Sequence, residues 1–180
     1  MQIRDACAER DAAACAAIYA PYVRDTVISF EDRPPSAGEL AQRIETITQT
    51  HPWLVAADEA ALIGFAYATR HRERASYRWA TDVAVYVTPG RQRAGVGRAL
   101  YRALFDRLAR QGYRMACAGI TLPNEASVGL HEALGFQPVG VYRKIGWKLG
   151  AWHDVGWWQL ALPGAGISGE DPPREPQPAG

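Results

Sequence analysis

The strongest pattern in the chain is a helical one over residues 96–111. Apolar side chains recur there every four residues: Val96, Leu100, Leu104 and Leu108. Gly112 follows at the position where a helix commonly ends, so this predicted helix has a clear apolar face and a clear stop. Residues 8–22 are rich in alanine and also have a helical pattern, and we expect Pro21 to disturb the last turn.

Two shorter helices are indicated by the residues at their ends. Ser36 and Glu39 have the spacing of a capping box, in which each side chain accepts a hydrogen bond from the other residue's backbone N–H, and apolar residues follow at helical spacing. The second short helix covers residues 124–134 and is closed by Gly135.

Strands are predicted from the alternation of side chains. In residues 81–87 the three valines face one way, whereas Asp82, Ala84 and Tyr86 face the other. Residues 27–30 are predicted to be extended, and further β-like runs cover 2–4, 53–57, 61–69, 114–120, 136–142 and 155–162. The runs at 53–57 and 61–69 are expected to pair as a hairpin. The pattern predicts a mixed α/β protein built around a strand–loop–helix unit.

Composition and charge narrow the class of protein. The 180 residues are 48% hydrophobic and 22% charged, with a formal net charge of +1, which is ordinary for a soluble globular protein. This balance argues against a nucleic-acid partner bound through general basicity. No apolar run approaches the ~20 residues that span a bilayer, and the first residues lack the apolar core of a signal peptide. We therefore expect a cytoplasmic protein without a membrane or nucleic-acid partner.

The cysteines and histidines indicate neither disulfides nor a metal site, and the end of the chain differs in composition from the rest. Cys7, Cys15 and Cys117 lack the spacing of a disulfide framework, and the four histidines are too scattered for a zinc signature, so no metal is expected. Residues 163–180 are rich in Pro and Gly and are predicted to be a flexible tail. One domain over residues 1–162 is therefore expected.

The loop at residues 91–98 has the features of a phosphate-binding site. Gly95 and Gly97 let backbone N–H groups approach a ligand, and the N-terminus of the following helix adds partial positive charge. Three arginines add full charges: Arg91, Arg93 and Arg98. A P-loop would need Lys-Ser/Thr after its second glycine, and a dinucleotide fingerprint would need a third glycine where Leu100 stands. A diphosphate of another kind is therefore predicted.

The residues QRAGVG at 92–97 resemble the pyrophosphate motif of the GNAT N-acetyltransferases. Four further segments resemble one group of that superfamily, the phosphinothricin N-acetyltransferases: ISFE at 28–31 with the proline pair at 34–35, LPNEAS at 122–127, HEALGF at 131–136, and GWKLGAWHDVG at 146–156 followed by WWQL. Together these motifs cover roughly residues 2 to 162.

The resemblance implies the GNAT fold, an α/β (α+β) arrangement with a central, mixed, mostly antiparallel and twisted sheet flanked by helices. In that fold two central strands diverge and hold acetyl-CoA as a co-substrate. It implies that backbone groups of residues 85–87 pair with the pantetheine arm and that Asn124 contacts it. The residues assigned to the cofactor are Val85, Tyr86, Val87, Arg91, Arg93, Ala94, Gly95, Val96, Gly97, Arg98, Asn124 and Ser127.

Two residues are candidates for proton transfer. An amine with a pKa near ~10 must lose a proton before it attacks a thioester, and Asp82 is placed to accept that proton directly or through water. The family has Glu at this position, and the shorter Asp favours a bridging water. His131 stands where many GNAT enzymes have Tyr, and the resemblance implies that it protonates the departing thiolate; as a neutral imidazole it could instead be the base.

The implied substrate is a small anionic amino acid: phosphinothricin, its arsenic analogue, methionine sulfoximine or methionine sulfone. Arginine suits such oxyanions, and the residues assigned to the substrate are Arg72, Arg74, Tyr77, Phe30 and Glu31. Arg70 and Arg78 in the same loop are equally well explained as a solvated charged surface. Arginines interleaved with aromatic residues also suit single-stranded RNA, which the balanced charge disfavours.

Two other functions stay open. The same fold could acetylate a protein N-terminus or an aminoglycoside, although clustered arginines disfavour the aminoglycoside. A non-catalytic acetyl-CoA sensor would bind the cofactor without turnover, which the presence of both Asp82 and His131 disfavours. Tryptophans near the end of the chain fit a core or a subunit interface, and the resemblance implies a homodimer.

Overall fold

The computed structural model describes residues 1–59, 61–91, 94–164 and 174–178. Its elements follow the predicted order, and their bounds are β1 Gln2–Asp5, α1 Ala8–Asp25, α2 Ala37–Thr48, β2 Trp53–Ala57, β3 Leu62–Arg70, a 3₁₀ turn Ala75–Tyr77, β4 Ala80–Val87, α3 Val96–Gln111, β5 Met115–Leu122, α4 Glu125–Glu132, β6 Gln137–Lys148 and β7 Ala151–Ala161. The described strands form one seven-stranded sheet in the order β1-β2-β3-β4-β5-β7-β6. Neighbouring strands are antiparallel except β4 and β5, which are parallel.

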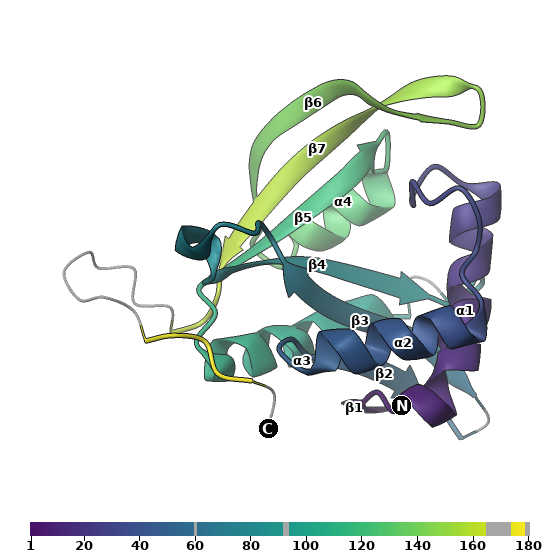
Figure 1. Ribbon diagram of the computed structural model, residues 1–180. Coiled ribbons are helices and arrows are strands. Elements are labelled where there is room, and N and C mark those ends of the chain that lie inside the picture. Colours follow the sequence, from purple (N-terminus) through teal and green to yellow (C-terminus); the bar gives the residue numbers. More distant parts are fainter. Residues whose placement is uncertain (60, 92–93, 165–173, 179–180) are drawn as a thin grey trace.

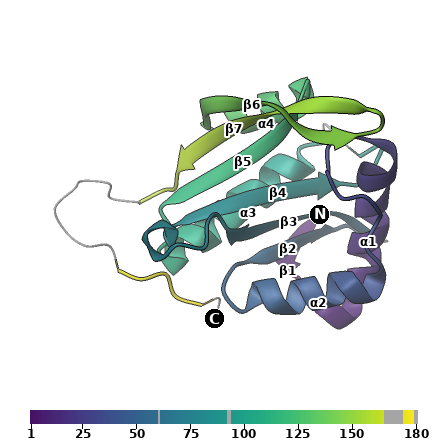
Figure 2. The same ribbon diagram turned by 45° about the horizontal axis from the view of Figure 1, so that its top comes forward.

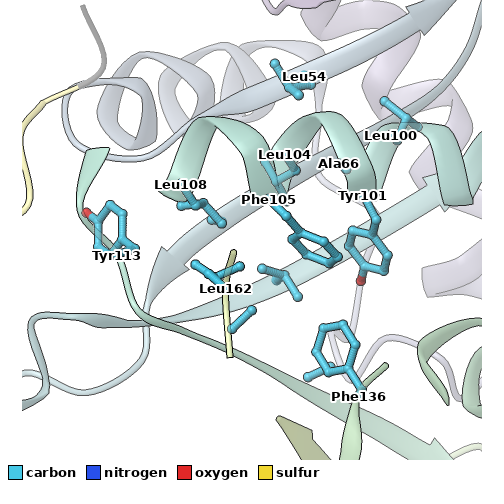
Figure 3. Close-up of a cluster of buried hydrophobic side chains, with 14 of the residues drawn as sticks. Leu54, Ala66, Leu100, Tyr101, Leu104, Phe105, Leu108, Tyr113, Phe136 and Leu162 are labelled. Carbon is cyan, nitrogen blue, oxygen red and sulfur yellow. The ribbon is translucent and has the colours of Figure 1, made fainter. Parts of the chain in front are cut away.

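Helices cover both faces of the sheet (Figures 1 and 2). Helices α1 and α2 lie on one face, and α3 and α4 lie on the other. Alternation along β2 explains the two layers, because Trp53 and Val55 pack with α1 and α2 whereas Leu54 and Ala56 pack under α3. Figure 3 shows leucines of α3 in the second of these cores, in which Phe136 also packs. The α/β fold class predicted from the sequence is confirmed.

The ends of α3 and α2 are as predicted. Gly95 and Gly112 flank α3 with φ angles of 79° and 96°, a left-handed conformation that glycine adopts without strain. At α2 the capping box is complete, since Ser36 Oγ accepts from the N–H of Glu39 and the Glu39 carboxylate accepts from the N–H of Ser36.

Three details of the prediction are wrong. Helix α1 continues through Pro21 to Asp25, because the loss of one backbone hydrogen bond is offset by contacts of the last turn, including the fully buried Val23. Residues 27–29 form a bend and not an extended segment. Strands β6 and β7 reach much further than predicted and form a long hairpin that rises beyond the rest of the sheet (Figure 1).

Residues 165–173, 179 and 180 of the predicted flexible tail lie outside the described residues. Residues 174–178 contact the domain: the backbone N–H of Gln177 donates to the Gln111 carbonyl at 2.7 Å, and Trp79 Nε1 donates to the Arg174 carbonyl at 2.8 Å. Among the described helices, none combines the length and the apolar character that a membrane span needs.

Candidate active site

The central feature of the site is the divergence of β4 and β5. Their parallel pairing joins Ala80, Thr81 and Asp82 of β4 to residues 115–117 of β5 and stops there among the described residues. Beyond Asp82 the two strands separate, so the β5-facing backbone edge of residues 83–87 has no strand partner. An extended ligand can add to such an edge as a further strand would.

Two adjoining hollows follow this divergence. The inner hollow, of about 70 Å³, is lined by both strands and α4, with Ile28, Val83, Ala84, Val85, Tyr86, Tyr101, Ala118, Gly119, Ile120, Thr121, Asn124, Ser127 and His131. The outer hollow, of about 320 Å³, is lined by Ile28, Phe30, Tyr67, Thr69, Asp82, Val83, Ala84, Gly119, Thr121, Val155 and Trp157. Five residues are common to both hollows, so the two adjoin along the gap between β4 and β5, and together they are called the cleft.

The strand predicted to pair with pantetheine, residues 85–87, directs its side chains to both faces of the sheet. The ring of Tyr86 packs edge-on against Tyr19 and Tyr22, at centroid distances of 4.6 and 5.3 Å, on the α1 side of the sheet. The Val87 carbonyl already accepts a hydrogen bond from the Tyr22 hydroxyl at 2.5 Å. The side chains of Val85 and Val87 pack on the other face, against the core under α3.

The predicted phosphate loop leads into the N-terminus of α3. Gly95 lies directly before the first helical residue, and a Cβ added to it would meet nothing within 4 Å, so the backbone there is open to a ligand. Ala94 and Arg98 are exposed, whereas Val96 is buried and anchors the first turn. Free N–H groups at such a terminus favour an anion.

The predicted arginines of this loop differ in their surroundings. Arg91 pairs with Asp58 at 3.2 Å. Arg93 and its neighbour Gln92 lie outside the described residues. Arg98 has no ion pair with any described residue, so its charge is available to a ligand.

Asn124 and Ser127 lie together at the start of α4. Asn124 is the N-cap, and its Oδ1 accepts a hydrogen bond from the backbone N–H of Ser127 at 3.1 Å. Both residues line the inner hollow together with Val85 and Tyr86, so the structure brings these four predicted cofactor residues around one hollow.

Asp82 lies at the point where the strands separate and lines the outer hollow. Its Oδ1 is 2.6 Å from His71 Nδ1, and ligand atoms of His71, Asp82 and Cys117 lie within 4.8 Å of one another. Burial raises the pKa of the Asp82 carboxyl, and the hydrogen bond from His71 and the nearby charges of His71 and Arg72 limit that rise. A carboxylate with a raised pKa is a stronger base than an exposed one.

His131 is buried beneath the inner hollow with both ring nitrogens engaged. Nδ1 lies 2.7 Å from the Ser127 carbonyl oxygen, which only accepts, so Nδ1 carries the hydrogen. Nε2 is 3.1 Å from the Tyr101 hydroxyl and accepts from it in the neutral form. Burial lowers the pKa of His131, which favours this neutral form.

The residues assigned to the substrate separate into three groups. Phe30 lines the outer hollow, whereas Arg72, Arg74 and Tyr77 are exposed in the loop between β3 and β4. Glu31 lines neither hollow: Arg43 donates to its two carboxylate oxygens at 2.7 and 2.9 Å.

The remaining two arginines of that loop, Arg70 and Arg78, differ in their contacts. Arg78 pairs with Glu175 of the described tail and lies over the ring of Trp79. Arg70 is exposed.

The sequence interpretation gave no role to two residues that shape the cleft, His71 and Lys148. The buried Lys148 Nζ donates to the carbonyls of Val23, Ser29 and Glu31 at 2.5, 2.6 and 3.0 Å, and so ties the loop that carries Phe30 to the end of β6. Lys148 lies within the motif at 146–156, but the motif does not indicate these contacts with residues 23–31. The position of His71 depends on the register of the β3–β4 hairpin, in which Thr69 pairs with Asp82 and His71 comes close to the carboxylate.

Comparison with known proteins agrees with this geometry. The family model described as an acetyltransferase (GNAT) domain matches residues 5–157. The phosphinothricin N-acetyltransferase of Streptomyces viridochromogenes is 40% identical over 159 residues, which cover 88% of this chain and 86% of the relative. A methionine sulfoximine/methionine sulfone acetyltransferase of Pseudomonas aeruginosa is 33% identical over 148 residues, which cover 81% of this chain and 86% of that protein.

A solved structure has the same fold. The phosphinothricin acetyltransferase of Sinorhizobium meliloti, in complex with acetyl-CoA, superposes with a TM-score of 0.89 at 37% identity and covers 97% of this chain and 93% of its own. The chain therefore belongs to the GNAT acetyltransferases, enzymes that transfer an acetyl group from acetyl-CoA. Within that superfamily the resemblance to the phosphinothricin N-acetyltransferases is confirmed.

Proposed function

We propose that this protein transfers an acetyl group from acetyl-CoA to the α-amine of phosphinothricin or of a similar small anionic amino acid. The similar substrates are arsinothricin, methionine sulfoximine and methionine sulfone. The observation that carries the proposal is the position of Asp82, which lines the amine-sized outer hollow where β4 and β5 separate. The names of the relatives, which act on phosphinothricin and on the two methionine derivatives, support the choice of substrate.

Acetyl-CoA fits the residues of the inner hollow. Its pantetheine arm would pair with the free edge of residues 83–87, and its diphosphate would lie on the loop before α3, near Gly95 and Arg98. Arg91, Arg93, Ala94, Val96 and Gly97 complete this loop in the proposal, and Asn124 and Ser127 border the arm. When bound, acetyl-CoA supplies an acetyl group activated as a thioester.

Asp82 accepts the proton of the substrate ammonium in this proposal. The amine is then neutral, and its lone pair attacks the acetyl carbonyl. The short Asp side chain reaches the amine directly or through one water molecule. The raised pKa of Asp82 supports this role, because it brings the carboxylate closer to the pKa of the amine.

His131 assists the departure of the leaving group, which is the thiolate of the coenzyme. The thiol of the coenzyme has a pKa near ~8.5, so the thiolate leaves without full protonation and needs only modest help. Tyr101 also lines the inner hollow, and its hydroxyl hydrogen-bonds to His131 Nε2. We assign the Tyr101–His131 pair to stabilise the thiolate. The Tyr101 hydroxyl donates the hydrogen bond, and its hydrogen turns from His131 Nε2 toward the sulfur to do so. With Nε2 already accepting a hydrogen bond, the geometry favours Asp82 over His131 as the base.

The exposed arginines hold the anionic end of the amino acid. Arg72 and Arg74 have no ion pairs with described residues, and Arg72 is close enough to Asp82 to affect its pKa. Their guanidinium groups suit carboxylate and phosphinate oxygens. Phe30 lines the outer hollow, and Tyr77 packs against His71 beside Asp82. Glu31 supports this site indirectly by holding Arg43.

The hairpin of β6 and β7 supports a homodimer. Large apolar side chains that are 44–62% exposed gather on it: Val139, Val141, Tyr142, Ile145, Trp147, Leu149 and Trp152. An exposed apolar patch of this kind marks an association surface. We further propose one acetyltransferase domain over residues 1–162 that acts in the cytoplasm, where acetyl-CoA is available.

Thiol release from acetyl-CoA in the presence of a panel of amines tests the function. The panel contains phosphinothricin, methionine sulfoximine, methionine sulfone, an aminoglycoside and a short peptide with a free N-terminus. We expect release with the first three and none with the last two. Preference for the peptide would contradict the proposed substrate, and acetyl-CoA binding without release on any amine would indicate a sensor.

A further inference from the structure

His71 contacts Asp82 from behind the substrate cleft. Its Nδ1 lies 2.6 Å from Asp82 Oδ1, and the two side chains are only 16% and 33% exposed. Asp82 lines the outer hollow, whereas His71 is absent from the lining of either hollow. His71 therefore reaches the substrate only through the Asp82 carboxylate.

The surroundings of His71 fix its imidazole ring. Tyr77 and Trp157 pack edge-on against it, with centroid distances of 6.1 and 5.9 Å. The β3–β4 register places His71 two residues beyond Thr69, the partner of Asp82, so the backbone also sets its position. A ring held on two sides directs a hydrogen bond with little loss of entropy.

We propose that His71 is a positioning residue for acetyl transfer, whose Nδ1–H holds the Asp82 carboxylate so that its second oxygen receives the proton of the substrate amine. This inference rests on the proposed function. The aspartate side chain is short, so the reach of its carboxylate depends on a fixed rotamer. The hydrogen bond to Oδ1 supplies that constraint, and Oδ2 has no hydrogen-bond partner among the described residues.

The proton transfer balances without a further reactant. The N–H bond of the substrate ammonium breaks, its electron pair stays on nitrogen, and the proton moves to Asp82 Oδ2. The lone pair then forms the bond to the acetyl carbon as the bond to sulfur breaks, and the second proton of the nitrogen moves to the departing thiolate, so that the products are the amide and the free thiol. His71 keeps its own hydrogen throughout, and Asp82 returns its proton to water after product release.

Two variants of His71 separate positioning from packing. His71→Phe keeps an aromatic ring between Tyr77 and Trp157 but removes the donor, whereas His71→Asn keeps an N–H donor near the position of Nδ1. We expect His71→Phe to lower kcat roughly 10- to 100-fold, as loss of a supporting hydrogen bond does at other sites. The KM for acetyl-CoA should not change, and His71→Asn should recover most of the lost kcat.

The double variant His71→Phe/Asp82→Asn gives the decisive comparison. Because His71 acts through the carboxylate, adding His71→Phe to Asp82→Asn should lower kcat no further. Each of three results would overturn the inference. These are losses of kcat that multiply in the double variant, an unchanged kcat in His71→Phe, and a kcat of His71→Asn as low as that of His71→Phe. Thermal unfolding of every variant checks the fold, and the Asn variant keeps the test valid if the Phe variant unfolds.

The activity of the wild-type enzyme distinguishes a failure of this inference from a failure of the proposed function on which it rests. No thiol release by the wild type with any amine of the panel would contradict the proposed function. An active wild type together with an equally active His71→Phe would contradict the role of His71 alone.

Discussion

The ring of Phe30 fills the space that a Cβ atom on residue 146 would occupy, so Phe30 and Gly146 fit together because residue 146 has no side chain. Phe30 comes from the loop after α1, and Gly146 comes from β6. The contact lets this loop close one side of the outer hollow. Gly146 is the first residue of the sequence motif at 146–156, and the fold shows the steric reason for a glycine at this position.

Gly146→Ala should therefore displace Phe30 and weaken binding of the amine. We expect the KM for phosphinothricin to rise roughly tenfold, which corresponds to about 1.4 kcal/mol, while the affinity for acetyl-CoA stays the same. Gly140→Ala on the same strand is the matched control, because its Cβ would meet nothing within 4 Å. Equal steady-state constants for the two variants would contradict the role of this contact.

Lys148 stabilises the same loop from within the protein. Lys148→Met removes three hydrogen bonds to backbone carbonyls and leaves those buried acceptors unpaired. We expect the free energy of unfolding to fall by about 2 kcal/mol or more, measured by urea denaturation. The exposed Lys144→Met serves as the control. If both variants unfold at the same urea concentration, Lys148 does not anchor the loop.

The role of Asp82 as proton acceptor predicts a particular pH profile. Only the carboxylate accepts a proton, so kcat/KM of the wild type should fall as the pH drops through the pKa of Asp82, which burial raises above its ordinary value. Asp82→Asn should lower kcat/KM by ~10²- to 10⁴-fold near neutral pH. The loss should shrink at alkaline pH, where the amine is already deprotonated and needs no acceptor.

The exposed Asp106→Asn on α3 is the control for Asp82→Asn and should match the wild type. A pH profile of Asp82→Asn that runs parallel to that of the wild type would remove Asp82 as the base. His131 would then be the candidate that the geometry leaves.

The apolar surface of the β6–β7 hairpin predicts the assembly state. Trp147 and Trp152 lie edge to face, with centroids 5.4 Å apart, and are 59% and 58% exposed. Substitution of both by Glu should convert a dimer into a monomer in sedimentation velocity, since two charges would have to be buried in the interface. Circular dichroism checks that the fold is kept. A wild-type protein that sediments as a monomer would contradict the proposed dimer.

The success of the sequence interpretation depended on how local each signal is. The bounds of α3 were predicted to the residue, because its apolar repeat and both glycines lie within or beside the segment itself. The β6–β7 hairpin was underestimated, since its outer half exposes Ile145 and Trp147 and shows no alternation of buried and exposed positions. Apolar side chains that stay exposed in this way do not follow the alternation from which strands are predicted.

The residues of the candidate site also differ in how local their sequence signals are. Motifs and strand alternation placed the phosphate loop, Asn124 and Asp82 along the chain. The fold brings Asn124 and Asp82 to two adjoining hollows and places the loop directly before α3. The hydrogen bond between His71 and Asp82 depends on the register of a hairpin, and the contacts of Lys148 join segments more than 100 residues apart. Such long-range pairs leave no pattern in a single sequence.

Calorimetric titration tests most directly whether the diverging strands and the loop before α3 hold acetyl-CoA. Titration of the wild-type protein with acetyl-CoA should give saturable binding of one molecule per chain, and S-acetylpantetheine, which lacks the diphosphate, should bind far more weakly because it makes no contact with the N-terminus of α3. Absence of binding heat with acetyl-CoA at several temperatures, or equal affinity for the two compounds, would contradict the account.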